Sequence, residues 1–240
     1  MESQSTTVVL IHGAFADSSC WNPVIALLPA ETLRVRSFAN PLRGIPDDAR
    51  ALRAFLSTVD GPIVLVGHSY GGAVITEAGA GHPDVRALVY VSAFIPEKDE
   101  VLGELFGRFP GSLLPQSLET FEIPGPDGIA STELTVSHDR YREVLAADVE
   151  ADASRLLAIA QRPLNATAFD TCARAAAWRA LPTWNYISQK DNGLPVALQR
   201  FQAERAGAFV EEGSTSHMAL VSRPARIAAL ITDAAERSAE

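Results

Sequence analysis

The sequence predicts an α/β fold in which a mostly parallel β-sheet carries helices on both faces and is interrupted by one inserted, mainly helical segment. Short apolar, β-branched runs alternate with longer amphipathic runs near both ends of the chain, which is typical of βα units. Three of these runs, 7–11, 62–66 and 87–91, are continuously apolar. Strands that helices cover on both faces have this composition. The 240 residues suffice for one large domain with its own core.

The first 94 residues hold four of the expected strands and three helices. Residues 34–38 give a weaker strand beside the three apolar runs. Asn22 followed by Pro23 combines an N-cap with a proline at the first helical position, and predicts a helix through about residue 28. A second helix begins at Pro46, where apolar side chains recur at helical spacing. The small, apolar residues 72–78 predict a third helix that packs tightly on the sheet.

The composition changes after the third apolar run, and we expect residues 96–181 to form a helical lid insertion. Its first part is rich in proline and glycine, and 121–129 read as a hairpin that turns at Pro126-Asp127-Gly128. Its second part, 138–180, has alanine, arginine and acidic residues at helical spacing. An insertion of this length is long for an ordinary loop.

The β pattern returns after the insertion. Strands are expected at 182–188 and 208–211, with a helix over 195–206 between them and a last helix from about Pro224. Segments 1–95 and 182–240 would then form one core domain.

Charge and composition exclude several classes of protein. The 20 basic and 29 acidic residues give a net charge of −9, the wrong sign for binding nucleic acid or an anionic membrane. Two cysteines, Cys20 and Cys172, are too few for a disulfide framework or a zinc site with local ligand pairs. The first residues lack a secretory signal, and no apolar run is long enough to span a bilayer. We therefore expect a cytoplasmic protein with a small-molecule partner, and a homodimer through an exposed helix stays open.

A motif follows the second apolar run. Gly67-His68-Ser69-Tyr70-Gly71 fits G-x-S-x-G, the nucleophile elbow, in which a serine sits on a sharp strand-to-helix turn. Such a serine has a strained backbone, at a cost of roughly 1–3 kcal/mol. A glycine-rich phosphate-binding turn is the alternative, but the chain has no lysine where a P-loop needs one.

A serine nucleophile needs a base, and the chain has five histidines. His217 follows the last predicted strand, the place that the chain order Ser…Asp…His requires. His68 lies inside the elbow with its ring expected to point away from the serine hydroxyl. His82 and His138 read as surface residues at helix ends, and His12 as a residue that holds its loop through side-chain hydrogen bonds.

The carboxylate that orients the base should leave a strand before His217. Asp191 follows the strand 182–188 and is the candidate, although Asp-Asn-Gly is also ordinary turn chemistry. Glu97 and Asp99 follow the strand 87–91 and are the rival acids.

Two backbone N–H groups are needed to stabilise the oxyanion of acyl transfer. The elbow predicts one from Tyr70, the residue after the nucleophile, and one from Ala14 in the loop after the first strand. The alternative for the loop that contains Ala14 is a tight turn after the first strand without a catalytic role.

Several motifs in this order resemble the α/β-hydrolase superfamily, in particular the small esterases grouped with plant methylesterases and hydroxynitrile lyases. The motifs are 9–14 (VLIHGA) with Trp21 shortly after, 67–75 (GHSYGGAVI), 88–94 (LVYVSAF) and 161–163 (QRP). The resemblance implies a catalytic triad of Ser69, His217 and Asp191, no metal or organic cofactor, and a helical lid over an apolar pocket.

The family contains two chemistries, which two positions distinguish. In the lyases a lysine follows the catalytic histidine and a threonine lies near the first strand; here these positions are Met218 and Gly13. The resemblance therefore implies a carboxylesterase or methylesterase-like serine hydrolase that cleaves a small carboxylic ester through an acyl-enzyme. Hydroxynitrile lyase chemistry, cofactor-free perhydrolase chemistry on the same triad, and a non-catalytic ligand receptor stay open as alternatives.

Aromatic residues are candidates for the substrate pocket. We expect Phe15 and Trp178 to line it together with Tyr70. Other large apolar residues of the insertion could complete its ceiling: Phe106, Phe109, Phe121, Leu156 and Phe169. Plain core packing is the alternative for each of them.

Overall fold

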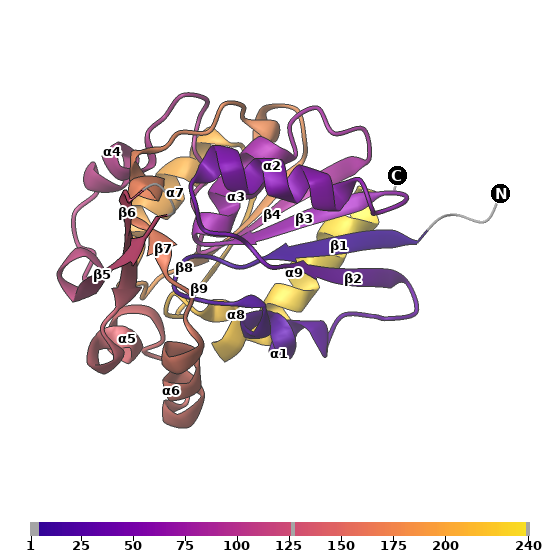
Figure 1. Cartoon of the computed structure of the whole chain (residues 1–240). Helices are drawn as coiled ribbons and strands as arrows, with labels where there is room; N and C mark the ends of the chain where they lie inside the picture. Colours follow the sequence, from indigo (N-terminus) through magenta and orange to yellow (C-terminus); the bar gives the residue numbers. More distant parts are fainter. Residues whose placement is uncertain (1–4, 126–127, 239–240) are drawn as a thin grey trace.

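The protein is built on a parallel sheet (Figure 1). The computed structural model describes residues 5–125 and 128–238, and within them six strands form this sheet in the order β2-β1-β3-β4-β8-β9. Every neighbouring pair in the sheet is parallel. The strands are β1 (Thr6–Ile11), β2 (Leu33–Phe38), β3 (Ile63–His68), β4 (Val85–Val91), β8 (Thr183–Ser188) and β9 (Phe209–Gly213). The predicted strands are confirmed within about two residues at either end.

Helices cover both faces of the sheet. The connection between two parallel strands of one sheet is right-handed. A helix in such a connection therefore lies on one face of the sheet when the chain moves along the strand order in one direction, and on the other face when the chain moves in the opposite direction. The first face carries α2 (Ile45–Leu56), α3 (Tyr70–Ala78) and α7 (Val196–Arg205). The second carries α1 (Asn22–Ile25) and α9 (Pro224–Arg237), with η1 (Ser18–Trp21) and α8 (Ala219–Ser222) beside them. Among the described residues, no helix combines the length and the apolar character needed to cross a bilayer.

The central strands are mostly apolar because both of their faces are covered. All residues of β3 are buried, and so are those of β1 after Thr6. The helix α1 is shorter than predicted and ends at Ile25. The next turns are 3₁₀-type turns, with hydrogen bonds from Leu27 N–H to Val24 O and from Leu28 N–H to Ile25 O. Pro29 then disfavours a helical backbone at the residue before it.

Between β4 and β8 the chain forms further helices and a small antiparallel sheet, β5-β6-β7. These elements gather beyond the carboxyl ends of the strands (Figure 1). Their bounds are α4 (Leu102–Gly107), η2 (Pro115–Ser117), β5 (Leu118–Pro124), β6 (Ala130–Val136), α5 (His138–Leu145), α6 (Ala151–Ala160), β7 (Leu164–Asn165), η3 (Ala166–Asp170) and η4 (Ala177–Arg179). The predicted hairpin is confirmed as β5 and β6, while Pro126 and Asp127 of its turn lie outside the described residues. The strand β7 was not predicted.

An ion pair joins this small sheet to the loop before α2. The Arg43 guanidinium donates to both carboxylate oxygens of Glu133 at 2.6 Å, and the Glu133 side chain is fully buried. Ser131 and Asn165 donate to the same carboxylate. Burial opposes ionisation of Glu133, but the hydrogen bonds from Arg43 and Ser131 outweigh it and lower the pKa of this carboxyl. The backbone N–H of Arg43 donates to Asp48 on α2 at 2.9 Å, so one residue connects the insertion with the core.

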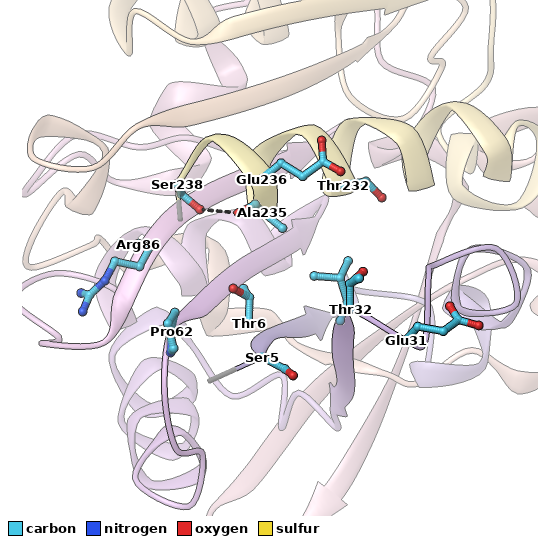
Figure 2. A pocket seen from close by; sticks show the side chains of 11 residues that line it. Ser5, Thr6, Glu31, Thr32, Pro62, Arg86, Thr232, Ala235, Glu236 and Ser238 are labelled. Carbon is cyan, nitrogen blue, oxygen red and sulfur yellow. Dashed lines mark hydrogen bonds between the residues drawn. The ribbon is translucent and has the colours of Figure 1, made fainter. Parts of the chain in front are cut away.

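A polar hollow lies at the opposite, amino edge of the sheet (Figure 2). It is lined by residues at the starts of strands, among them Thr6 and Leu33, and by Ala235 and Glu236 near the end of α9. Ligands of open parallel sheets bind outside the carboxyl ends of the strands. A functional site is therefore expected at the other, carboxyl edge.

The Arg43→Met substitution tests the ion pair that joins the insertion to the core. We expect the free energy of unfolding to fall by about 2 kcal/mol, because the buried Glu133 carboxylate keeps its desolvation cost and loses its cation. Urea denaturation at neutral pH measures the change.

Arg50→Met is the matched control. Arg50 pairs with Asp47 on the surface, where their side chains are 79% and 58% exposed. Removing such a pair should change stability by less than about 0.5 kcal/mol. Equal losses in the two variants would contradict a specific contribution from Arg43.

Candidate active site

Ser69 lies on a sharp turn between β3 and α3. Its backbone has φ 53° and ψ −124°, a conformation that residues with a Cβ rarely adopt. A Cβ on Gly67 would lie 2.7 Å from backbone atoms of Gly71 and Gly72, so the close contact of strand and helix requires glycine there. This is the geometry of a nucleophile elbow, as the motif predicts. The Ser69 residue is 8% exposed.

A histidine and a carboxylate form a buried pair on two neighbouring loops. Nδ1 of His217 lies 2.7 Å from Oδ2 of Asp191. The carboxylate also accepts the N–H groups of Gly193 at 2.8 Å and Leu194 at 2.7 Å, and the side-chain amide of Gln199 at 2.9 Å. These donors fix the orientation of the Asp191 carboxylate, so that it accepts a hydrogen bond from Nδ1–H of His217. Nε2 of the imidazole is then the nitrogen left for a reacting group.

Of the rival acids, neither Glu97 nor Asp99 is bonded to the imidazole. Glu97 forms a surface ion pair with Arg179, and the hydrogen bond from Arg179 lowers the pKa of Glu97. Asp99 lies in the loop before α4, where its N–H donates to the carbonyl of Ala173. In the part of the chain that the structure describes, the carboxylate bonded to His217 is Asp191.

A second imidazole supports the loop that carries His217. His68 is buried, its ring centroid lies 4.8 Å from that of His217, and its Nε2 lies 3.1 Å from the His217 carbonyl. Burial lowers the pKa of His68 well below its ordinary value, so the ring is neutral and Nε2–H donates to that carbonyl. The sequence placed His68 away from the nucleophile but gave no sign of this contact.

His12 holds the loop after β1 through hydrogen bonds, as expected. Its Nε2 accepts the Asn40 N–H at 3.0 Å, and its Nδ1 lies 2.8 Å from the Gly13 carbonyl. The Asn40 amide donates to the His12 carbonyl at 3.2 Å. Burial lowers the pKa of His12 to about 4, which keeps the ring neutral. Sequence reasoning missed Asn40, since nothing in its local sequence indicates a contact 28 residues away.

The same loop approaches the nucleophile closely. A Cβ on Gly13 would lie 2.6 Å from Cβ of Ser69 and 3.0 Å from the His68 carbonyl. A threonine at this position would therefore have to displace the nucleophile. Ala14 follows Gly13 and lines the same cavity as Ser69 and Tyr70.

An apolar cavity opens at Ser69 and His217. The residues that line it come from the elbow, from the loops after the strands and from the insertion: Ala14, Phe15, Ser69, Tyr70, Phe94, Phe106, Leu114, Leu145, Phe169, Gly193, Leu194 and His217. The Tyr70 hydroxyl is bonded to Asp48 Oδ2 at 2.7 Å. The cavity volume is about 20 Å³, room for about one water molecule.

Trp178, an expected pocket residue, is not among the residues that line this cavity. Its indole N–H donates to the Pro96 carbonyl at 2.9 Å, and its ring contacts the guanidinium groups of Arg179 and Arg205. A buried indole needs an acceptor for its N–H, and Trp178 has one beside the strand exit of β4.

The other expected pocket residues divide into two groups. Phe15, Phe106 and Phe169 line the cavity. The remaining three do not: Phe109 packs on Phe201 with ring centroids 5.4 Å apart, Phe121 is 44% exposed and Leu156 is 59% exposed. Among residues 5–125 and 128–238, no three His, Cys, Asp or Glu side chains converge as a metal site would need.

Known proteins share this architecture. A family model described as "Alpha/beta hydrolase family" matches residues 8–230. The chain belongs to the alpha/beta hydrolase family. Within the alpha/beta hydrolases it is 29% identical to a pyrethroid hydrolase of Sphingobium wenxiniae, over 98% of this chain and 89% of that protein. It is 26% identical to Methylesterase 8 of Arabidopsis thaliana, over 90% of this chain and 84% of the relative.

Solved structures of alpha/beta hydrolases agree with the fold. Polyneuridine aldehyde esterase superposes with a TM-score of 0.82 at 18% identity, covering 96% of this chain and 99% of that one. A pyrethroid hydrolase of Sphingobium faniae gives 0.76 at 25% identity, covering 97% and 98%. The predicted α/β-hydrolase fold, a mostly parallel sheet with helices on both faces, and the resemblance to plant methylesterases are confirmed. The predicted enzyme class, carboxylic ester hydrolase, is the class to which the named relatives belong.

The buried neutral His12 predicts a pH dependence of stability. Its pKa is about 4 in the folded protein against 6.5 ordinarily, so below pH 6.5 the unfolded chain binds a proton that the folded protein does not. Its contribution to stability, up to ~3 kcal/mol, is present above pH 6.5 and is lost as the pH falls toward 4.

Urea unfolding of the wild type and of His12→Gln between pH 7 and pH 4.5 measures this effect. The glutamine carbonyl can accept the Asn40 N–H but does not titrate. We expect a shallower pH dependence of the unfolding free energy in the variant. The same dependence in both proteins would show that His12 is not the titrating group.

Proposed function

We propose that the chain is a serine hydrolase that cleaves a small, uncharged carboxylic ester through an acyl-enzyme on Ser69. One observation carries the proposal: the serine of a strained elbow and the imidazole of a buried His217–Asp191 pair line the same apolar cavity. A hydroxyl becomes a nucleophile when a positioned base takes its proton, and the base is effective when a carboxylate orients it.

The acylation step uses these groups in sequence. Oγ of Ser69 attacks the ester carbonyl while Nε2 of His217 takes the hydroxyl proton, and Asp191 stabilises the imidazolium that forms. The tetrahedral intermediate collapses as His217 gives the proton to the leaving alkoxide, which departs as the alcohol. Water then attacks the acyl-serine with His217 as base, and the products are the carboxylic acid and free Ser69.

The oxyanion of each intermediate needs backbone donors. Tyr70 is the first residue of α3, and the first N–H groups of a helix have no intrahelical acceptor. Ala14 follows Gly13, which contacts the nucleophile from the loop after β1. We assign the N–H groups of Tyr70 and Ala14 to the oxyanion hole.

The lining of the cavity supports an uncharged substrate. Apart from Ser69, Tyr70 and His217, its side chains are hydrocarbon or absent, and no lysine, arginine or carboxylate is among its lining residues. The relatives named pyrethroid hydrolase and Methylesterase 8 support ester cleavage over other reactions of the fold. The buried Met218 after His217 offers no cation for a departing cyanide, and Gly13 leaves no room for the threonine of the lyases.

We also propose that residues 96–181 act as a lid. Four of the cavity's lining residues come from this segment: Phe106, Leu114, Leu145 and Phe169. Because the cavity has room for about one water, we expect side chains around Ser69, those of the insertion among them, to move when an ester binds.

The Ser69→Ala substitution tests the nucleophile. We expect kcat/KM for p-nitrophenyl acetate and butyrate to fall by at least about 10³-fold, because the acyl-enzyme cannot form. An organophosphonate should label the wild type at Ser69 and leave the variant unlabelled.

Ser37→Ala is the control, since the buried Ser37 hydroxyl on β2 has no hydrogen-bond partner within the described part of the chain. Its activity should equal that of the wild type. If Ser69→Ala were as active as Ser37→Ala, the serine hydrolase mechanism would be refuted.

The apolar lining predicts discrimination against charge. At pH 8 we expect kcat/KM for p-nitrophenyl hemisuccinate, which carries a carboxylate on the acyl chain, to be lower than for p-nitrophenyl butyrate by about 10²-fold or more, because the cavity offers the charge no partner. Rates of alkaline hydrolysis of both esters correct for intrinsic reactivity. Equal corrected values would show that the acyl chain does not enter this cavity.

A further inference from the structure

Phe15 occupies an unfavourable backbone conformation next to the assigned oxyanion donor. Its φ is 58°, in the left-handed region that disfavours residues with a Cβ. The residue is buried and directly follows Ala14. The Phe15 carbonyl lies two peptide units along the chain from the Ala14 N–H, so a group that holds this carbonyl restricts the backbone that orients the N–H.

The group that contacts Phe15 comes from the insertion. The Tyr141 hydroxyl, on α5, donates to the Phe15 carbonyl at 2.9 Å. The Tyr141 side chain is itself buried, and burial raises the pKa of its phenol far above the ordinary value. The hydroxyl therefore keeps its proton, and stays a donor, at any pH suited to an assay.

The helix α5 and the loop that follows it also contact the other two loops of the site. The Met218 N–H, next to His217, donates to the Leu145 carbonyl at 3.0 Å. The Ser216 hydroxyl donates to the Asp148 carboxylate. In the loop that carries Asp191, the Asn192 amide donates to the Glu143 carbonyl at 2.9 Å.

We propose that Tyr141 is a positioning residue of the reaction: it fixes the loop of Ala14 and Phe15 relative to the loops of His217 and Asp191. This inference rests on the proposed function. Tyr141 touches neither the ester nor Ser69, and it acts through the carbonyl of Phe15. Because the oxyanion forms only after attack, a displaced Ala14 N–H weakens the transition state more than the bound ester.

Tyr141→Phe removes the hydroxyl and keeps the ring. We expect kcat for p-nitrophenyl butyrate to fall about 10- to 100-fold with KM changed less than about twofold. A trifluoromethyl ketone, which adds the Ser69 Oγ and forms an oxyanion, should lose affinity by the same factor as kcat/KM. A purely structural role would lower stability without this match between Ki and kcat/KM.

Tyr90→Phe is the matched control. Tyr90 is fully buried, and its hydroxyl bonds to Thr76 Oγ1 at 2.8 Å in the core, between β4 and α3. Removal of this hydroxyl should lower the melting temperature and leave kcat within about twofold of wild type. Site-specific p-aminophenylalanine at position 141 restores a donor of the same reach and should restore most of kcat.

The outcomes separate the two proposals. If Ser69→Ala retains the wild-type activity, the proposed function itself fails, whatever Tyr141→Phe does. If Ser69→Ala is inactive but Tyr141→Phe matches wild type in kcat and in Ki, the role of Tyr141 is overturned. Should Tyr141→Phe not fold, 3-fluorotyrosine at position 141, a stronger donor in an unchanged shape, should tighten binding of the ketone; an unchanged Ki would overturn the proposal.

Discussion

Ser69 has a strained backbone conformation, φ 53° and ψ −124°. Such a conformation persists only when the surrounding structure prevents the residue from adopting a more favourable one. Ser69 donates its N–H to the Val91 carbonyl on the neighbouring strand, and its own carbonyl accepts the N–H of Phe94. The strand before it and the helix after it touch at Gly67, where no Cβ fits. These contacts exist because β3 lies in the middle of the sheet and is buried along its whole length. The apolar core therefore supplies the stability that offsets strain at one residue, and the other groups of the site are arranged around that residue.

Two buried imidazoles surround the candidate triad without belonging to it. His12 holds the loop after β1, and His68 holds the loop of His217. In both cases burial lowers the pKa, so each ring stays neutral and offers one donor and one acceptor at fixed positions. A charged side chain in either place would carry a large desolvation cost.

The sheet and the triad candidates could be predicted from sequence because their signals are local. Continuous apolar runs indicate strands that helices cover on both faces. The five-residue motif G-x-S-x-G identifies Ser69. His217 follows from chain order once the strands are known. Chain order leaves Asp191 beside the rival acids Glu97 and Asp99, and the family resemblance favours Asp191. The contacts that hold the site have no local signal: Tyr141 reaches Phe15 across 126 residues, and Arg43 reaches Glu133 across 90.

Composition could not separate cavity residues from core residues, because large aromatic side chains occur in both places: Phe106 and Phe169 line the cavity, whereas Phe109 packs on Phe201. A cavity with room for about one water also affects the rate at which a substrate associates. If the insertion opens and closes over Ser69 as proposed, an ester that collides with the closed form dissociates again, and productive association is slower than diffusional encounter by the fraction of time that the cavity is open. Substitutions in Phe106 or Phe169 that enlarge this fraction would speed association without touching the bonds that react.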